Sequence, residues 1–270
     1  MFRPMDTIPQ VGVVLREWRA ARRLSQLDLS FRARVSARHI SYIETGKAVP
    51  SRDMVTRLAE ALDMPLREAN ALLGAAGYAP RYPETALDAT ELAPVRRAID
   101  LILRHQEPFP AFVMNRHWDI LLTNEAAVRV GDYLHGGSSH TNMVRQFFDP
   151  DDLRSVVVNW EEIARDLLRH LQDEITAVPS DDTARALLDE VVEYPGVPDE
   201  WRTRELGASP PPVLTVEFRK DGRSLRFFST IATFGTARDV TVEELRVECA
   251  FPADEETGAL CRELAGGVHR

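Results

Sequence analysis

Two helix starts lie only eleven residues apart at Ser25 and Ser36, and this spacing restricts the fold more than any other feature of the chain. Ser25 and Asp28 have the spacing of a capping box, in which each side chain bonds to the other residue's backbone amide. Ser36 is a second N-cap candidate. The helix between them is therefore short, and Arg34-Val35-Ser36 is left as a turn. Two short helices joined by about three residues form a helix-turn-helix unit.

The flanking sequence predicts further helices on both sides of this unit. Over residues 11–24, apolar side chains recur at the i, i+3, i+4 and i+7 positions of one helical face. The second helix of the unit runs over Ala37–Thr45, and Gly46 is suited to end it in a left-handed conformation. A fourth helix opens at Pro50-Ser51, and a fifth runs from Pro65 to about Ala76. We therefore predict a five-helix domain.

The helix over Ala37–Thr45 is the predicted DNA-reading element, because the second helix of such a unit lies in the major groove. Ile40 and Ile43 form its apolar pair and must face the core, so the opposite side faces outward. Arg38 has the geometry to read guanine with two hydrogen bonds. Gln26, at a helix N-terminus, is suited to hold a phosphate. The predicted DNA contacts are Gln26, Ser36, Ala37, Arg38, His39, Ser41, Tyr42, Lys47 and Arg52, of which His39, Lys47 and Arg52 are expected to contact only the backbone.

The charge distribution supports a nucleic-acid partner for this part of the chain only. The whole chain has a formal net charge of −9. Residues 1–82 carry 13 Lys and Arg against 8 Asp and Glu, a net charge of +5, whereas the remainder carries 20 against 34, a net charge of −14. Because phosphate attraction needs positive charge, this split predicts a basic DNA-binding module joined to an acidic one.

The stretch LREWRAARRLSQLDLSFRARVSARHISYIETGKAVPS resembles the DNA-binding domain of XRE-type regulators, the phage repressor and Cro-like family. The shared positions include Gln26, Leu29, the Val35-Ser36 turn, Ile40 and the segment 43–47, within a resemblance that covers roughly residues 10–76. Arg34 departs from the pattern, because family members often carry Gly there. A non-Gly residue at this position either adopts a positive φ at some cost or shifts the turn. The alternative to DNA binding is a five-helix bundle that binds protein.

The rest of the chain predicts a second domain of mixed composition. Residues 77–85 contain two prolines and no helical stripe, and we place the linker at residues 77–90 between domains at 1–76 and 91–270. Strand patterns occupy 111–115, 118–123, 214–219, 225–234 and 245–251, the third and fourth joined at an Asp-Gly hairpin. Helical stripes occupy 92–105, 142–148, a block from 153 onward that includes Trp160 and Leu187, and 254–264, with Pro210–Pro212 as a stiff connector. This order predicts an α+β domain, an antiparallel sheet with helices on one face.

Five stretches of this second half resemble the MmyB-like ligand-binding domain that follows XRE-type modules. They are GYAPRYPETAL, HWDILLTNEAA, VVNWEEIARDLL, EYPGVP and FFSTIATFGTARDVTVEELRVECAFPADEET, and they span roughly residues 77–264 in one order. The resemblance implies a PAS-like fold, in which a five-stranded antiparallel sheet and helices surround a small-molecule cavity. It also implies a transcription regulator whose operator binding responds to a ligand.

A PAS-like cavity would be lined by the concave face of the sheet and the facing helices. The candidate ligand contacts are Phe112, Trp118, Phe228, Thr230 and Phe234 from strands, and Phe148, Trp160 and Ile163 from helices. Such a lining is mostly apolar with few polar groups. Arg145 lies on an otherwise apolar predicted helix and is the candidate partner for a ligand carboxylate. We therefore expect a small apolar ligand, with a fatty acyl compound as the example that fits, although core packing is the commoner role of such aromatic residues.

Nothing in the sequence predicts catalysis, a metal site or a cofactor. Glu161 and Glu162 are adjacent carboxylates, but neighbours on a helix point apart. His135 and His140 have no further metal ligands at a suitable spacing. We expect a protein that is not an enzyme. Two alternatives stay open: a second domain that only dimerises or contacts a protein without a ligand, and a catalytic domain that the DNA-binding part localises.

The expected location is the cytoplasm and the expected partners are a double-stranded DNA operator, a small ligand and a second copy of the chain, with no membrane partner. No apolar run is long enough to span a bilayer, and residues 1–10 lack the apolar segment of a signal peptide. Cys249 and Cys261 do not form a disulfide framework. In a homodimer, the two reading helices would lie about 34 Å apart and match a two-fold operator.

Overall fold

The computed structural model describes residues 10–202 and 212–266 and divides into two units. The first unit contains the chain up to Thr85 together with Ile175–Ser180 and Thr236–Glu243. The second contains Ala86–Glu174, Asp181–Gly235 and the chain from Glu244 onward. Pro210 and Pro211 of the predicted connector lie outside the described residues.

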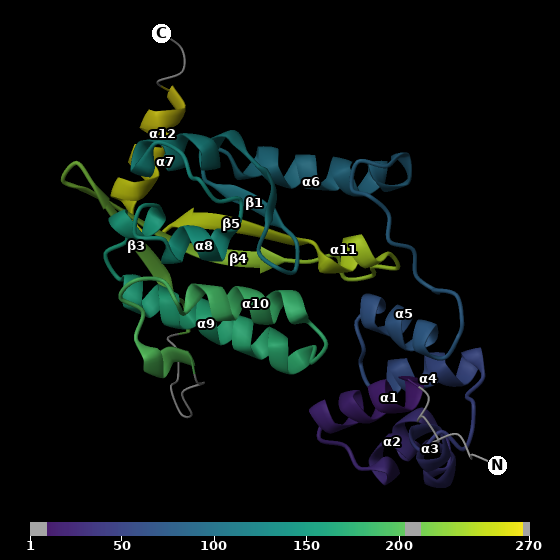
Figure 1. Ribbon diagram of the computed structural model, residues 1–270. Helices are drawn as coiled ribbons and strands as arrows, with labels where there is room; N and C mark the ends of the chain where they lie inside the picture. Colours follow the sequence, from purple (N-terminus) through teal and green to yellow (C-terminus); the bar gives the residue numbers. More distant parts are fainter. Residues whose placement is uncertain (1–9, 203–211, 267–270) are drawn as a thin grey trace. The chain divides into compact units, whose positions relative to one another are not determined.

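The five predicted helices of the N-terminal part of the chain are present, and all lie in the first unit (Figure 1). Their bounds are α1 Gln10–Ala21, α2 Gln26–Ala33, α3 Ala37–Glu44, α4 Arg52–Ala61 and α5 Leu66–Ala75. One apolar cluster joins them, and it includes Leu15 and Trp18 of α1 and Ile40 and Ile43 of α3. The predicted inner face of α1 and of α3 is therefore confirmed.

The predicted helix starts of this unit are also confirmed. Ser25 Oγ accepts a hydrogen bond from Asp28 N, and the Asp28 side chain accepts one from Ser25 N at 2.9 Å, which completes the capping box. Ser36 Oγ accepts from His39 N at 3.2 Å at the start of α3, and Ser51 caps α4 in the same way. These bonds satisfy first-turn amides that would otherwise be unpaired.

Arg34 adopts the left-handed conformation at the end of α2, with φ 53° and ψ 46°. Of the two alternatives for this non-Gly residue, the positive φ is therefore correct. The turn keeps its shape at a cost in backbone strain.

We expect Arg34→Gly to stabilise the first unit by about 0.5–1 kcal/mol, since glycine adopts this conformation without a Cβ penalty but loses more entropy on folding. Urea unfolding of the full chain measures the change. The matched control is Arg32→Gly, inside α2, which should destabilise by about 1 kcal/mol. Equal effects of the two substitutions would contradict the strain at Arg34.

After α5, the described residues form three short 3-10 helices, seven α-helices and five strands, nearly all of them in the second unit. The α-helices are α6 Ala93–Gln106, α7 Glu125–His135, α8 Met143–Phe148, α9 Trp160–Ala177, α10 Asp182–Val191, α11 Val240–Glu244 and α12 Glu255–Gly266, of which α9 and α11 run partly into the segments assigned to the first unit. The 3-10 helices are Thr90–Leu92, Leu153–Val156 and Asp199–Arg202. The sequence pattern missed α7, which begins after the N-cap Asn124 and ends at Gly136.

The five strands form one antiparallel sheet in the order β2-β1-β5-β4-β3. They are β1 Ala111–Met114, β2 Ile120–Thr123, β3 Thr215–Lys220, β4 Arg223–Ala232 and β5 Arg246–Pro252. The predicted five-stranded antiparallel sheet is confirmed. Asp221 and Gly222 form the β3–β4 turn with φ of 50° and 76°, the two positive values that a tight Asp-Gly hairpin requires.

The helices do not lie on one face of the sheet only, which corrects the sequence-based prediction. Ile99 and Leu103 of α6 cluster with Val113 and Val247 on one face. On the other face, Met114 and Phe227 belong to a larger cluster that includes α8 and α9 (Figure 1). The central strand β5 therefore has an apolar cluster on each side, with Val247 buried on one face and Ala250 on the other.

Asp181 fixes the β1–β2 turn against the start of α10. Its carboxylate lies 3.0 Å from Arg116 Nη2 and 3.0 Å from His117 Nε2, and it caps the amide of Ala184 at 3.0 Å. Burial alone would raise the pKa of Asp181, but the hydrogen bonds from His117 and Ala184 and the charge of Arg116 together lower that pKa to about 2. The ionised form is therefore favoured in the folded state.

We expect Asp181→Asn to lower the free energy of unfolding by about 2 kcal/mol near neutral pH. The asparagine side chain can still cap α10 but lacks the negative charge of the carboxylate. A lowered carboxyl pKa stabilises the fold above its unfolded value of 3.8, and this contribution is lost as the pH falls toward about 2. Urea unfolding of both chains from neutral to acid pH should therefore show a difference that narrows below about pH 4. A difference that stays constant with pH would contradict this account.

Candidate nucleic-acid interface and ligand cavity

The outward face of α3 is the side of the helix opposite its two buried isoleucines. Ile40 and Ile43 are 0% exposed. Arg38 is exposed, and Ala37, Ser41 and Tyr42 are partly exposed on the other side of the helix. The fold therefore presents a polar and basic helix face of the kind that docks in a major groove.

Arg38 and Tyr42 form a pair along this face. Arg38 Nε donates to Tyr42 Oη at 2.8 Å, and the guanidinium lies 5.2 Å from the centre of the Tyr42 ring. This contact fixes the direction of the arginine while using only one edge of its donor fork. Two parallel N–H donors are what bidentate recognition of guanine requires.

A buried polar network holds α1, α2 and α3 together beneath this face. Glu44, only 2% exposed, accepts hydrogen bonds from Arg19 Nε at 2.7 Å, from Arg19 Nη2 at 2.9 Å and from Gln26 Nε2 at 2.8 Å. Burial raises the pKa of Glu44, but these hydrogen bonds and the Arg19 charge outweigh it and leave the pKa below its ordinary value. No local sequence pattern indicates this network, because Gln26 and Arg19 lie 18 and 25 residues from Glu44.

The other predicted DNA contacts surround α3. One N–H of the Gln26 amide goes to Glu44, and the second is left for a phosphate. Ser36 caps α3, and His39 follows it on the first turn. Lys47 and Arg52 are exposed after α3 and at the start of α4, where Arg52 Nη2 lies 3.4 Å from Pro80 O. Contact of these residues with DNA stays a prediction.

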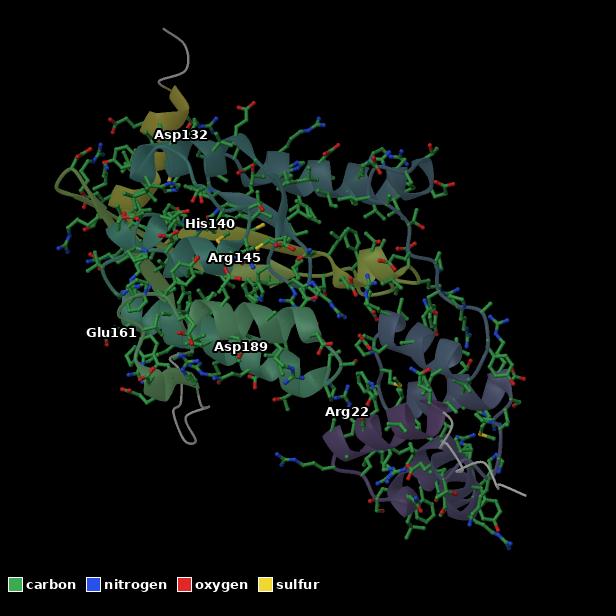
Figure 2. The ribbon with its side chains drawn as sticks, viewed as in Figure 1. Arg22, Asp132, His140, Arg145, Glu161 and Asp189 are labelled. Carbon is green, nitrogen blue, oxygen red and sulfur yellow. The ribbon has the colours of Figure 1, made fainter. Side chains whose placement is uncertain are left out.

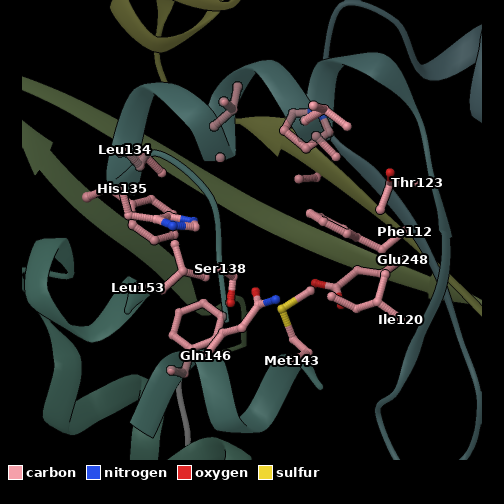
Figure 3. Close-up of a pocket in the computed structure, with 18 of the residues that line it drawn as sticks. Phe112, Ile120, Thr123, Leu134, His135, Ser138, Met143, Gln146, Leu153 and Glu248 are labelled. Carbon is pink, nitrogen blue, oxygen red and sulfur yellow. The ribbon is translucent and has the colours of Figure 1, made fainter. Parts of the chain in front are cut away.

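A cavity of about 310 Å³ lies in the second unit between the sheet, α7 and α8 (Figure 3). Strand residues on one face of the sheet line one side of it: Phe112, Ile120, Thr123, Val216, Phe218, Phe227, Ser229, Glu248 and Ala250. The register explains this set, because Phe112 pairs with Glu248 and Ser229 with Ala250, so their side chains share a face. Leu134 and His135 of α7 and Met143 and Gln146 of α8 complete the lining.

A second cavity of about 520 Å³ adjoins the first. It is bounded by Ile163 and His170 of α9, by Trp118 and by residues of β4. The two cavities share Met143, Phe147, Val216, Phe227, Ser229 and Glu248 as lining residues. Volumes of this order are typical of small-molecule sites.

Comparison with known families assigns both parts of the chain. Residues 95–264, more than half of the chain, match the MmyB-like transcription regulator ligand binding domain. The chain belongs to this family. Residues 10–72 match a helix-turn-helix domain.

No curated protein matches the chain. One solved structure, titled "Structure of an RNA-binding Light-Oxygen-Voltage Receptor", is similar at 13% identity over 98% of this chain and 70% of that one, with a TM-score of 0.24. A TM-score this low supports no argument about fold or function.

A helix-turn-helix domain followed by an MmyB-like ligand-binding domain is the arrangement of a DNA-binding, ligand-responsive transcription regulator. These families are those of regulators and not of enzymes. In the described residues, no helix combines the length and the apolar character that a membrane crossing requires.

The MmyB-like domain brings five of the nine predicted pocket residues to the two cavities. Phe112 lines the first, and the second is lined by Trp118, Ile163, Phe228 and Thr230. Phe228 and Thr230 alternate along β4 with Phe227 and Ser229, which line both cavities, so their side chains lie on the opposite face of the sheet, where Phe228 stacks on Phe251 with ring centres 5.5 Å apart. Trp118 is not in a strand as predicted but in the β1–β2 turn, with φ 67°. Ligand contact of these five residues stays a prediction.

The other four predicted pocket residues line neither of these cavities. Phe148 is 0% exposed in the core, and Trp160 packs against Trp201 at 5.7 Å and donates its indole N–H to the Phe147 carbonyl. Phe234 lies beyond the end of β4 and packs with the α6 cluster. Each is a packing residue, the commoner role of a large aromatic side chain.

Arg145 is the fourth predicted pocket residue outside the two cavities, and its guanidinium already forms an ion pair. Its Nε and Nη2 each donate to Glu190 at 2.7 Å, and Figure 2 labels it on α8. The hydrogen bond with Glu190 raises the pKa of Arg145. A guanidinium engaged in this bidentate pair outside both cavities is not positioned to bind a ligand carboxylate there.

Glu248 is the cavity residue that sequence reasoning missed. It alternates along its strand with apolar residues, but β5 is central and Glu248 lines both cavities. Burial raises the pKa of Glu248, opposed by its hydrogen bond with Ser229 and by the charge of His170. What places Glu248 at the cavities is the central position of β5 in the sheet. The alternation of apolar and polar residues along the strand does not show this position.

Proposed function

We propose that the protein is a cytoplasmic, homodimeric regulator that binds a double-stranded DNA operator through α3 and adjusts this binding when a small apolar ligand enters the cavities of the MmyB-like domain. In this proposal, residues 1–76 are the DNA-binding domain, 77–90 the linker and 91–270 the PAS-like sensor domain. A ligand acts by binding one arrangement of the dimer more tightly than another.

The observation that carries the proposal is the combination of an outward Arg38–Tyr42 pair on α3 with a sheet-lined cavity in a separate unit. The apolar lining supports an apolar ligand body, of which a fatty acyl chain is one example. The alternative, a second domain that only dimerises or contacts a protein, would favour a fully packed interior. Cavities of about 310 and 520 Å³ support ligand binding instead.

Selection of binding sites from a random duplex library tests the DNA-binding half. We expect Arg38→Ala to relax the base preference at one or two operator positions, at a cost of about 1–3 kcal/mol for the preferred base. Lys47→Ala is the matched control, and it should weaken all sequences alike and reduce the salt slope by about 1. An Arg38→Ala protein with the full base preference would remove Arg38 from base readout.

A further inference from the structure

Two short segments of the MmyB-like domain belong to the same compact unit as helices α1–α5. They are Ile175–Ser180, which contains the end of α9, and Thr236–Glu243, which lies between β4 and β5. The other residues that match this family lie in the second unit. We call these two stretches the docked segments. The DNA-binding helices are attached to the MmyB-like domain through them and not only through the chain that follows α5.

Arg22 holds the first docked segment at the end of α9. This residue follows α1 and is labelled in Figure 2. Its Nη1 donates a hydrogen bond to Ala177 O at 2.9 Å, while Nε and Nη2 donate to the carbonyl oxygens of Leu62 and Asp63 at 2.9 and 3.1 Å. The last carbonyls of a helix lack a partner within the helix and carry partial negative charge, so a guanidinium is a favourable partner. One side chain therefore ties the end of α9 to the end of α4.

Side chains of the same segment add two further contacts with the five helices. Val178 packs against their shared apolar cluster. Ser180 Oγ donates to Glu68 Oε2 at 2.8 Å, and Glu68 lies on α5 with only 6% of its surface exposed. Buried polar groups need hydrogen-bond partners, and Ser180 supplies one to this carboxylate. The first docked segment is therefore held by backbone, apolar and polar contacts together.

The second docked segment caps the start of α5. Pro65, the N-cap residue of α5, makes no side-chain hydrogen bond to the helix, and Glu243 Oε2 instead accepts from Leu66 N at 2.7 Å. A carboxylate at a helix N-terminus pairs with amides that have no partner inside the helix and with the positive end of its dipole. Val240, 1% exposed, adds a hydrogen bond from its backbone N to Pro83 O at 2.9 Å. Both docked segments therefore contact α5.

Each docked segment continues into elements that line the second cavity. On α9, the lining residues lie before the docked end of the helix, and they are Ile163, Asp166, Leu167 and His170. The other segment is preceded by β4, whose residues 227–231 line the cavity, and followed by β5, which contributes Glu248. Packed helices and strands shift as units and do not deform continuously. A ligand that changes the position of α9 or of the β4–β5 pair therefore acts on the docked segments.

We propose that the two docked segments carry the effect of cavity occupancy to the DNA-binding helices, with α9 and the β4–β5 pair as the moving elements. The inference rests on the proposed function and specifies how that function is regulated. Both segments contact α5, which packs on α1, and α1 packs on the reading helix α3. Coupling of this kind is reciprocal, so DNA must change the affinity for a ligand by the same factor as the ligand changes the affinity for DNA. Binding of DNA at α3 should therefore alter α9 and β5.

Reciprocity allows a test that needs no knowledge of the ligand. Hydrogen exchange of the full chain is compared with and without the duplex recovered by binding-site selection. We expect duplex binding to change exchange rates by about 2-fold or more in peptides that cover residues 163–170 of α9 and 246–252 of β5. Peptides from α12, which contributes no residue to either cavity, should not change and are the internal control.

Substitutions in the docked segments test whether these segments carry the effect. Val178→Ala, Ser180→Ala and Glu243→Ala combined remove the side-chain contacts and leave every predicted DNA contact in place. This variant should bind the duplex within about 3-fold of the unmodified chain but lose the change in exchange at residues 163–170 and 246–252. The matched control combines Val178→Ile, Ser180→Thr and Glu243→Gln. It keeps an apolar side chain, a hydroxyl and an acceptor at the three positions and should retain the change.

The outcomes separate this inference from the function on which it rests. Unchanged exchange at both cavity-lining stretches of the unmodified chain would overturn the inference while operator binding stands. A combined variant that keeps the full change would overturn it too, since the docked segments would not be the connection. If the selection recovers no preferred duplex, the proposed function itself fails and the inference falls with it. Ser180→Ala alone, at an exposed side chain, serves if the combined variant does not fold, and it should reduce the change relative to Ser180→Thr.

Discussion

Replacing Gly12 with alanine is expected to destabilise the DNA-binding unit by about 2 kcal/mol or more. A Cβ at this position would lie 2.6 Å from the Ile43 carbonyl oxygen and 3.0 Å from that of Glu44. Both are backbone atoms of α3, so no side-chain rotation relieves the contact. Overpacking of this kind costs about 3 kcal/mol, which exceeds the gain of about 1 kcal/mol that alanine brings to a helix interior.

Gly74→Ala is the matched control for this substitution. Gly74 lies in α5, and a Cβ there meets nothing within 4 Å, so alanine should stabilise the unit by about 0.5–1 kcal/mol. Hydrogen exchange of peptides from α1 and α3 in the full chain measures both effects. Gly12→Ala should raise exchange in these peptides and weaken operator binding. Protection equal to that of the unsubstituted chain would show that α1 and α3 are not in close contact.

Removing the Glu44 carboxylate should have the largest effect on stability, about 3–5 kcal/mol for Glu44→Ala. The substitution leaves the guanidinium of Arg19, only 16% exposed, and the amide of Gln26 without their acceptor. Because the pKa of Glu44 is lowered in the folded state, its stabilising contribution is present above the ordinary carboxyl pKa and is lost on acidification. Urea unfolding at neutral and acid pH should show both the loss and its decline at low pH.

Glu60→Ala is the control, because the exposed Glu60 lies 3.6 Å from Arg81 in a surface pair that contributes at most about 1 kcal/mol. Operator binding should fall with Glu44→Ala, since the network positions α2 and α3. An effect of Glu44→Ala as small as that of Glu60→Ala would mean that the buried network does not hold the unit together.

The helix-turn-helix unit could be predicted closely from the sequence because its signals are local. Ser25, Asp28 and Ser36 fix helix starts through bonds to amides within three residues, and Ile40 and Ile43 show the buried face directly. The positive φ of Arg34 is local too, because it follows from the turn position that this residue occupies between two capped helices. The strand number and the hairpin at Asp221-Gly222 were accessible for the same reason.

The cavity could be predicted only in part, because its geometry depends on pairings between distant segments. Alternation along β5 separates two faces but does not tell which face meets the cavity, so Glu248 was not among the predicted cavity residues. The partner of Arg145 is Glu190, 45 residues away, and no spacing rule connects them. Phe148 and Trp160 were assigned to the cavity because an aromatic residue in the core and one in a pocket have the same sequence pattern.

Binding-site selection with the purified full chain at moderate ionic strength, with and without added cell extract, tests most directly that this is a sequence-specific, ligand-responsive regulator. The account predicts enrichment of a two-fold symmetric site with half-sites about one helical turn apart, and a change in affinity for that site when the extract supplies a ligand. Recovery of unenriched sequence under both conditions would contradict it.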